Sequence, residues 1–390
     1  MLICRRLLQI GALTPFLLAG CASSTPPKQV SDLPKTATSS GPIRIGPTEP
    51  SPESSDESSA TALPNGKLRP EVEAFARDLA ARNNLPLDQV IGSLSSARYS
   101  ATVARLIMPS TPDHKVWRSW LTYRSRFVEP KRIRWGVAFW QANASTLSQA
   151  EQRYGVPAKI IAGIIGVETI YGRNMGDFRV MDALSTLAFD YPVPDKPERA
   201  EMFRGQLAAF ITLSLQGRLD IDTRGSYAGA IGMPQFMPDS IVRYAVDGSG
   251  NAGAHIDLAN NPADAIMSVG NYLASHGWVR GVPVFAPVAL PADALPLVAG
   301  GLAPTLDWNY LKASGARLAM GASEDAWSRH PLGVVDLVEE ARGTAQYRTG
   351  TPNFFAITQY NHSYFYATAV SDLADAVAQQ VGPVLAGSSL

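Results

Sequence analysis

Apolar residues recur at the three- and four-residue spacing of an α-helix through most of the chain beyond residue 67. The clearest stripes predict helices over 72–79, 130–155, 197–217, 262–277 and 366–377. Near Val279 this spacing is lost, and the runs 334–338 and 345–358 are typical of short strands bounded by turn residues. The pattern predicts an α+β fold that is predominantly helical, with a small β-containing insertion.

One stretch, Val156–Gly172, is apolar on more than one face, which predicts a helix buried in the core. Pro157 suits its first turn, and Gly172 suits the residue just beyond its end. Glu168 is its one carboxylate. Because apolar burial disfavours the charged form, the pKa of Glu168 should rise, and a protonated acid can give its proton to a leaving group. The alternative is a structural Glu168, paired with an arginine or reaching the surface.

The start of the chain resembles the leader of a bacterial lipoprotein. Arg5 and Arg6 precede an apolar run within Met1–Gly20 that is too short to span a bilayer as a mature helix. The run ends in L-L-A-G-C at Leu17–Cys21, which resembles a lipobox and implies cleavage before Cys21 and lipidation of its sulfur. The alternative is an ordinary secretory signal with an incidental cysteine.

The segment behind the leader, up to about Gly66, is rich in Ser, Thr and Pro and poor in large apolar residues. Such a segment cannot offset its ordering entropy, so it is predicted to be a disordered tether. Ala22 stands where an aspartate would suggest retention in the inner membrane. We therefore expect a lipid anchor at the periplasmic face of the outer membrane, with the inner membrane as the less favoured alternative.

The cysteine content argues against disulfide bonds, and the net charge argues against nucleic-acid binding. Cleavage would remove Cys4 and lipidation would consume Cys21, so no disulfide is predicted. Removing Arg5 and Arg6 from the 34 basic residues leaves 32 against 34 acidic residues, a net charge of about −2. This balance gives no basis for nucleic-acid binding.

A loop of small and polar residues follows, R-G-S-Y-A-G-A-I-G-M-P-Q-F-M-P at Arg224–Pro238. Its glycines allow close backbone approach to a ligand. Ser226 and Gln235 can hydrogen-bond hydroxyl or acetamido groups, and Tyr227 can present a ring face to a sugar, which suits a neutral polyhydroxylated polymer. The alternative is a tight loop whose aromatic residues belong to the core.

Near the end of the chain, Gln359–Ser363 reads Q-Y-N-H-S before a predicted helix. Asn361 could cap this helix or face the ligand beside Tyr360 and Tyr366. Nothing places His362 beside a nucleophile, and the sequence contains no zinc-protease, phosphate-loop or dinucleotide motif.

Together, the segments G-V-E-T-I-Y-G, G-S-Y-A-G-A-I-G-M-P-Q-F-M-P and Q-Y-N-H-S-Y-F-Y resemble the membrane-bound lytic murein transglycosylase B family. The resemblance covers roughly residues 68–381. It implies a lysozyme-like core with a helical domain and a small β domain. It also implies cleavage of the β-1,4 bond between N-acetylmuramic acid and N-acetylglucosamine in peptidoglycan, which leaves a 1,6-anhydro ring on the muramic acid.

The resemblance further implies that Glu168 is a single catalytic acid and base, and that no cofactor is required for the chemistry. The implied glycan-binding residues are Ser226, Gln235, Tyr272, Tyr360, Asn361 and Tyr366. The expected partners are peptidoglycan strands, and the membrane through Cys21, with the protein a monomer. The alternatives are a lysozyme-type hydrolase, which needs a second carboxylate, and a non-catalytic peptidoglycan-binding lipoprotein. Asp177, Asp182 and Asp190 follow Glu168 and are expected to be structural.

A candidate structural calcium loop resembles the single EF-hand-like loop of the same family. Alternating oxygen donors suit a hard cation, and the candidate ligands are Asp247, Ser249, Asn251 and His255. The loop departs from the family pattern by extra residues before His255, and an asparagine, Asn260 or Asn261, stands near the expected acidic closing ligand.

These observations divide the chain into consecutive segments. The predicted parts are a leader (1–20), a tether (21–66), a helical domain (67–155), a lysozyme-like catalytic core (156–278), a small β-containing domain (279–350) and a return to the core and helical domain (351–390).

Overall fold

The computed structural model describes residues 59–108, 116–248 and 255–387. The predicted leader, Cys21 and most of the predicted tether lie outside the described residues. The last part of that predicted tether, 59–66, belongs to the folded body, because Ala60 and Thr61 are fully buried. The division into domains otherwise stays a prediction. In the described ranges, no helix is long and apolar enough to cross a membrane.

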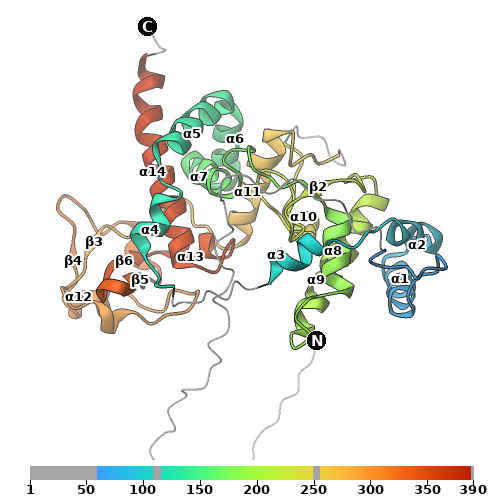
Figure 1. The fold of residues 1–390 in the computed structure, drawn as a ribbon. Helices are drawn as coiled ribbons and strands as arrows, with labels where there is room; N and C mark the ends of the chain where they lie inside the picture. Colours follow the sequence, from blue (N-terminus) through green and yellow to red (C-terminus); the bar gives the residue numbers. More distant parts are fainter. Residues whose placement is uncertain (1–58, 109–115, 249–254, 388–390) are drawn as a thin grey trace, which may run out of the picture. The chain divides into compact units, whose positions relative to one another are not determined.

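The described residues confirm the predicted α+β class in which helix predominates (Figure 1). The α-helices are α1 (Pro70–Asn83), α2 (Leu87–Ser95), α3 (Ala101–Ile107), α4 (Trp120–Ser125), α5 (Pro130–Ala142), α6 (Ala144–Tyr154), α7 (Ala158–Thr169), α8 (Val180–Phe189), α9 (Pro197–Leu215), α10 (Pro238–Tyr244), α11 (Pro262–Ser275), α12 (Trp308–Ala313), α13 (Pro352–Thr358) and α14 (Tyr364–Gly387). The short 3-10 helices are η1 (Leu295–Leu297), η2 (Ala326–Arg329) and η3 (Glu340–Arg342).

The described strands form antiparallel pairs. The pairs are β1 (Phe178–Arg179) with β2 (Arg224–Gly225), β3 (Val288–Ala289) with β4 (Arg317–Leu318), and β5 (Gly333–Glu339) with β6 (Thr344–Gly350). The long hairpin of β5 and β6 runs in register from Gly333 opposite Gly350 to Glu339 opposite Thr344. It lies within the range predicted to be an insertion.

Two predicted elements were wrong in detail. The single helix predicted over 130–155 is broken at Asn143, whose φ of −123° and ψ of 22° leave the helical region and whose Nδ2 donates to the Phe139 carbonyl (2.8 Å). The strand predicted over 345–358 ends at Gly350, and α13 follows. Thr351 Oγ1 accepts from the backbone N–H of Asn353 (3.2 Å) and Pro352 fills the first helical position, which together start a helix.

The helix predicted to be buried is α7, and all its residues except Lys159 and Glu168 are buried. It packs against α5, α6, α11 and the long α14 (Figure 1). The approach to α14 is close, because a Cβ at Gly163 would lie 2.9 Å from the Val370 carbonyl oxygen. A helix surrounded in this way is a rigid support for a side chain at its end.

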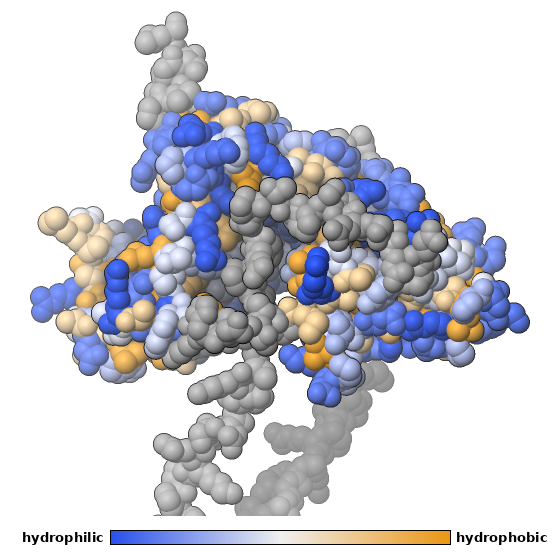
Figure 2. Space-filling view, viewed as in Figure 1, coloured by the Kyte–Doolittle hydropathy of each residue, from blue (hydrophilic) through white to orange (hydrophobic). Residues whose placement is uncertain are grey.

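The insertion has an apolar cluster of its own. Trp308 and Trp327 pack edge to face at its centre, with ring centroids 5.3 Å apart. The main cluster contains α7 and most other helices. On the face drawn in Figure 2, hydrophilic and hydrophobic residues are interspersed. This texture is usual for a protein surface.

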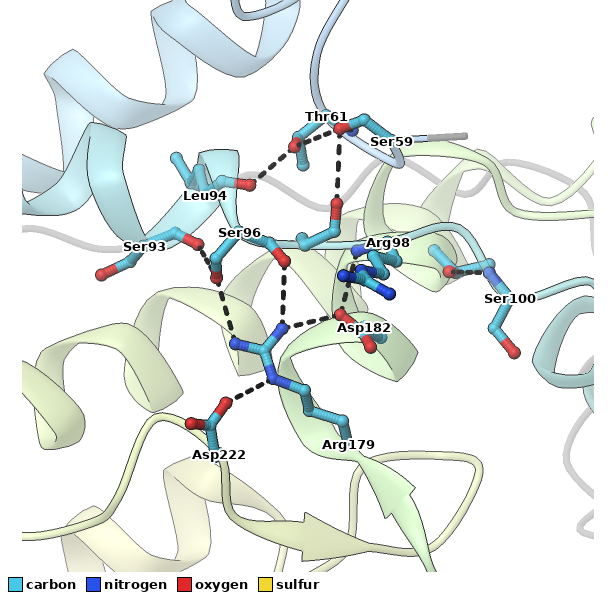
Figure 3. A network of polar contacts seen from close by, with 12 residues as sticks. Ser59, Thr61, Ser93, Leu94, Ser96, Arg98, Ser100, Arg179, Asp182 and Asp222 are labelled. Carbon is cyan, nitrogen blue, oxygen red and sulfur yellow. Dashed lines mark hydrogen bonds and ion pairs between the residues drawn. The ribbon is translucent and has the colours of Figure 1, made fainter. Parts of the chain in front are cut away.

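A polar network joins the first described residues to the α2 and α8 region (Figure 3). Thr61 Oγ1 donates to the Leu94 carbonyl (2.6 Å). Arg179 donates to Asp182 (2.8 Å), Asp222 (2.7 Å) and the Ser96 carbonyl (3.1 Å). The network ties the N-terminal helices to the segment that follows α7.

Candidate active site

Glu168 lies on the last turn of α7 and is partly exposed, whereas Val167 and Thr169 are buried. The hydroxyl of Tyr366, on α14, donates a hydrogen bond to Glu168 Oε1. Burial raises the pKa of Glu168 to about 7, and the hydrogen bond from Tyr366 opposes this rise. Among the described residues, no arginine or lysine pairs with this carboxylate. An acid with this pKa can both donate and accept a proton near neutral pH.

The backbone directly after Glu168 is left-handed. Ile170 has a φ of 53° and Tyr171 a φ of 59°, and Gly172 follows with a φ of 82°. The helix therefore ends at Thr169, three residues before the predicted stop at Gly172. A non-glycine residue in this region costs roughly 1–3 kcal/mol, and such positions cluster at functional sites.

The glycine-containing loop packs over the end of α7. Thr169 Oγ1 donates to the Met233 carbonyl (2.9 Å) and accepts from the backbone N–H of Gly172 (3.0 Å). The loop begins at β2, where Gly225 leaves room for the chain to fold back. A Cβ there would lie 2.2 Å from the Ala230 carbonyl oxygen. The loop is therefore fixed beside the turn that carries Glu168.

Ser226 and Gln235 shape this loop as well as being candidate ligand residues. Ser226 Oγ accepts from the backbone N–H of Ala230 (3.0 Å), which leaves its hydroxyl hydrogen free to donate elsewhere. Gln235 has a φ of 51°, and its Nε2 donates to the carbonyls of Gly232 (3.0 Å) and Met175 (3.2 Å). Tyr227 is partly buried against the main core.

Tyr272 on α11, Tyr360 in the turn after α13 and Tyr366 on α14 lie together near Glu168. Tyr360 donates to the Pro234 carbonyl (2.8 Å), and Tyr272, on α11, donates to the Gln359 carbonyl (2.7 Å). The Tyr272 and Tyr360 rings are 4.7 Å apart, and the Tyr360 and Tyr366 rings stack at 6.4 Å. Burial raises the pKa of Tyr360 and of Tyr366, and the charge of Glu168 raises both further. Both phenols therefore stay neutral hydrogen-bond donors.

Tyr123 is a member of this group that the sequence did not identify. Burial raises its pKa, and the charge of Glu168 raises it further, so Tyr123 lies within electrostatic reach of the same carboxylate. It lies on α4, whose first turn is held by Glu339: Leu121 N–H donates to Oε1 (2.6 Å) and Ser119 Oγ donates to Oε2 (2.9 Å). In the sequence Tyr123 follows Trp117, Trp120 and Leu121 in an apolar cluster, and no spacing rule links it to Glu168.

Asn361 lies near the tyrosines, whereas the three aspartates that follow Glu168 form ion pairs. Asn361 is partly exposed directly after Tyr360. It does not cap α14, because Ser363 Oγ accepts from the Tyr366 N–H (3.3 Å) and takes that role. The three aspartates that follow Glu168 pair with arginines, as expected of structural residues: Asp177 with Arg224 (3.3 Å), Asp182 with Arg179 (2.8 Å) and Asp190 with Arg69 (2.9 Å).

The candidate calcium loop is closed by a residue that the sequence did not single out. Asp264 is fully buried, and it accepts from the backbone N–H groups of Gly248 and Asp257 (both 2.8 Å) at the two ends of the loop. The ring of His255 instead hydrogen-bonds the Gly217 carbonyl (3.2 Å). Ser249 and Asn251 lie outside the described residues.

The described part of the chain contains no cluster of three His, Cys, Asp or Glu side chains able to hold a metal. Asp264 is a buried carboxylate beside this loop, three residues after Asn261. Among the described residues, its Oδ2 accepts a hydrogen bond from the Asp257 N–H and its Oδ1 accepts one from the Gly248 N–H. The carboxylate oxygens of Asp264 are of the kind that suits a hard cation.

The profile of the Transglycosylase SLT domain family matches residues 67–375. The chain is 40% identical, over 321 residues, to the membrane-bound lytic murein transglycosylase B of Escherichia coli strain K12, covering 79% of this chain and 83% of that protein.

Solved structures are similar over the same region. The soluble lytic transglycosylase SltB1 of Pseudomonas aeruginosa is 39% identical with a TM-score of 0.70, covering 80% of this chain and all of that one. The Escherichia coli lytic transglycosylase Slt35, solved in complex with calcium, is 36% identical with a TM-score of 0.68, covering 85% and 99%. SltB3 of Pseudomonas aeruginosa, solved with NAG-NAM-pentapeptide, is 28% identical with a TM-score of 0.66, covering 79% of each chain.

Proposed function

The chain belongs to the Transglycosylase SLT domain family, and from this premise we propose that Glu168 is the single acid and base of a peptidoglycan lytic transglycosylase. The observation that carries the proposal is the position of Glu168 at the end of a buried helix, where burial raises the pKa of its carboxyl to about 7 and Tyr366 donates a hydrogen bond to it. No other carboxylate contributes to the pKa of Glu168 among the described residues.

The proposed reaction needs one carboxyl group. Protonated Glu168 gives its proton to the glycosidic oxygen as the bond from that oxygen to C1 of the muramic acid breaks. The resulting carboxylate then takes the proton of the C6 hydroxyl as O6 bonds to C1, which closes the 1,6-anhydro ring. No water is consumed, and Glu168 ends protonated as it began. An attack within one sugar also benefits from a high effective concentration.

Tyr366 contributes to the second half of this cycle. Its hydrogen bond stabilises the carboxylate form of Glu168, which is the form that must exist between the two proton transfers. Because Tyr366 occupies Oε1, Oε2 is the oxygen that we assign to the substrate. Ser226, Tyr227, Gln235, Tyr272, Tyr360 and Asn361 are the proposed glycan-binding residues.

The mass of the products tests this proposal against lysozyme-type hydrolysis. The folded body, from residue 59 onward, is incubated with purified peptidoglycan, and the released muropeptides are weighed by mass spectrometry. Anhydro products, which lack the elements of water, are expected. Reducing-end products would contradict the proposal and would require a second carboxylate facing Glu168.

We also propose that the 247–264 loop binds calcium. Asp264 closes the loop, and Asp247, Ser249, Asn251 and His255 remain the candidate ligands from the sequence, His255 through its backbone if its ring stays on Gly217. The relative solved with calcium supports this choice of ion. Calcium should raise the melting temperature of the native protein and not that of Asp247→Asn. An equal response of both proteins, or none, would contradict the site.

Finally, we propose a monomer that is attached through a lipid on Cys21 to the periplasmic face of the outer membrane. The leader pattern and the membrane-bound relative support this location. Cys21→Ser should move the protein from the membrane fraction to the soluble fraction of cells. Unchanged membrane attachment would exclude the lipid anchor.

A further inference from the structure

Arg132 lies on α5 beside the end of α7 and takes no part in the proposed chemistry. Its side chain is buried, with 3% of the residue exposed. Its Nη1 donates to the carbonyl oxygens of Gly166 (2.9 Å) and Val167 (3.4 Å). These are the two residues that immediately precede Glu168.

The end of α7 explains why these carbonyls accept from a side chain. In a continuing α-helix, the N–H groups of Ile170 and Tyr171 would bind the carbonyls of Gly166 and Val167. Because the chain turns left-handed there, both N–H groups point to the Ile165 carbonyl instead. Arg132 supplies donors to the two carbonyls that the helix end leaves without their usual partners.

Burying the Arg132 guanidinium beside α7 costs desolvation free energy. Among the described residues no carboxylate lies within ion-pair distance of Arg132, and its Nε lacks a hydrogen-bond partner. Burial lowers the pKa of Arg132, and the charges of Tyr171 and Glu129 only partly oppose this. An apolar side chain would fill the space without this desolvation cost. What the charge does contact is the negative end of α7, together with the face of the Phe127 ring at 5.2 Å.

We propose that Arg132 is a positioning residue that holds the last turn of α7, and with it the Glu168 carboxyl, in the geometry needed for proton transfer. The inference rests on the proposed role of Glu168. Arg132 contacts neither that carboxyl nor the proposed glycan-binding residues, so it acts through the backbone of Gly166 and Val167.

Replacing Arg132 should therefore change catalysis more than substrate binding. In Arg132→Met, kcat on soluble glycan strands should fall about 10- to 100-fold, because small displacements of a catalytic group have effects of this size. KM should stay within about twofold, since the binding residues are untouched. A loosened last turn admits water to Glu168, so the basic limb of the kcat–pH profile should move to lower pH. Arg132→Lys, which keeps the charge, should recover part of both effects.

Arg134→Met is the matched control, because Arg134 is exposed on the same helix. It should leave kcat and the pH profile unchanged. A purely structural Arg132 would lower the melting temperature of Arg132→Met without moving the basic limb, and that result would overturn the proposal. If Arg132→Met fails to fold, Arg132→Gln is measured in the same way, and a normal kcat and profile in it would also overturn the proposal.

Failure of this inference can be distinguished from failure of the proposed function. An active Glu168→Gln would remove the basis of both. An inactive Glu168→Gln together with a normal Arg132→Met would leave the proposed function standing and exclude the positioning role alone.

Discussion

At the scale of residues, the site depends on the environment of one carboxyl group. The buried apolar turn raises the pKa of Glu168, and Tyr366 lowers it, so its value is a balance between two opposing effects. The sequence predicted the first effect from the apolar run around Glu168. It could not predict the partner, because Tyr366 is distant in the chain and only the packing of α14 against α7 brings it near.

Tyr366→Phe tests this balance. Removing the hydroxyl removes the hydrogen bond that lowers the pKa of Glu168, so that pKa should rise above about 7. Because the first step needs protonated Glu168, the basic limb of the kcat/KM–pH profile should move to higher pH. The maximal rate should fall, since the carboxylate loses its donor.

Tyr364→Phe provides the control for Tyr366→Phe. Tyr364 lies on the same helix and donates to the Gly301 carbonyl rather than to Glu168. Its loss should leave the basic limb in place. If both variants moved the limb equally, or neither did, the assignment of Tyr366 to Glu168 would be wrong.

Tyr123 and Arg132 could not be identified as residues of the site from the sequence. Arg132 donates to the end of α7 from α5, and Tyr123 on α4 is close enough for the charge of Glu168 to raise its pKa. Residue type and spacing identified the carboxyl and the polar loop because their local chemistry is unusual. An aromatic residue in an aromatic cluster, or an arginine in an amphipathic helix, carries no such local signal.

At the scale of elements, close packing between α7 and its neighbours keeps the site in place. The sequence identified α7 itself, because continuous apolar character needs no knowledge of the partners. It missed the break at Asn143 and the start of α13, where a side-chain hydrogen bond and a cap decide the local structure. Apolar periodicity does not register these polar contacts.

Gly163→Ala should show how tightly α7 and α14 are packed. The added Cβ would lie 2.9 Å from the Val370 carbonyl oxygen and 3.1 Å from the Ala374 Cβ, so the helices must move apart. We expect a loss of roughly 1–3 kcal/mol in the free energy of unfolding, which is typical of overpacking, measured by urea denaturation.

Gly92→Ala is the matched substitution for Gly163→Ala. Gly92 lies exposed within α2 with no neighbour near the added Cβ, so alanine there should stabilise the protein by roughly 0.5–1 kcal/mol. Equal effects of the two alanines would show that α7 and α14 are not in close contact.

At the scale of the whole molecule, the class of fold and the helical predominance followed from the sequence. The described chain adds that the insertion has its own apolar cluster around Trp308 and Trp327. Glu339, at the end of β5, accepts hydrogen bonds from Ser119 and Leu121 at the start of α4. These bonds link the insertion to the helix that carries Tyr123. Contacts of this kind between distant segments could not be predicted from periodicity.

The raised pKa of Glu168 should also lower the stability of the whole protein. A carboxyl group with a folded-state pKa near 7 and an ordinary value near 4.5 destabilises the folded state increasingly as the pH rises between those values. Glu168→Gln does not titrate. The variant should therefore gain stability relative to the native protein from pH 4 to pH 8, on the order of 3 kcal/mol. Urea denaturation at both pH values measures this, and a pH-independent difference would contradict the raised pKa.

The most direct test of the account is the turnover of purified peptidoglycan by Glu168→Gln at neutral pH. Glutamine keeps the shape of the side chain and can accept from Tyr366, but it cannot donate and recover a proton as the mechanism requires. The account predicts a folded variant, with an unfolding transition at least as stable as the native one, that releases no muropeptides above background. Release of anhydro products at a rate close to the native rate would contradict the central role of Glu168.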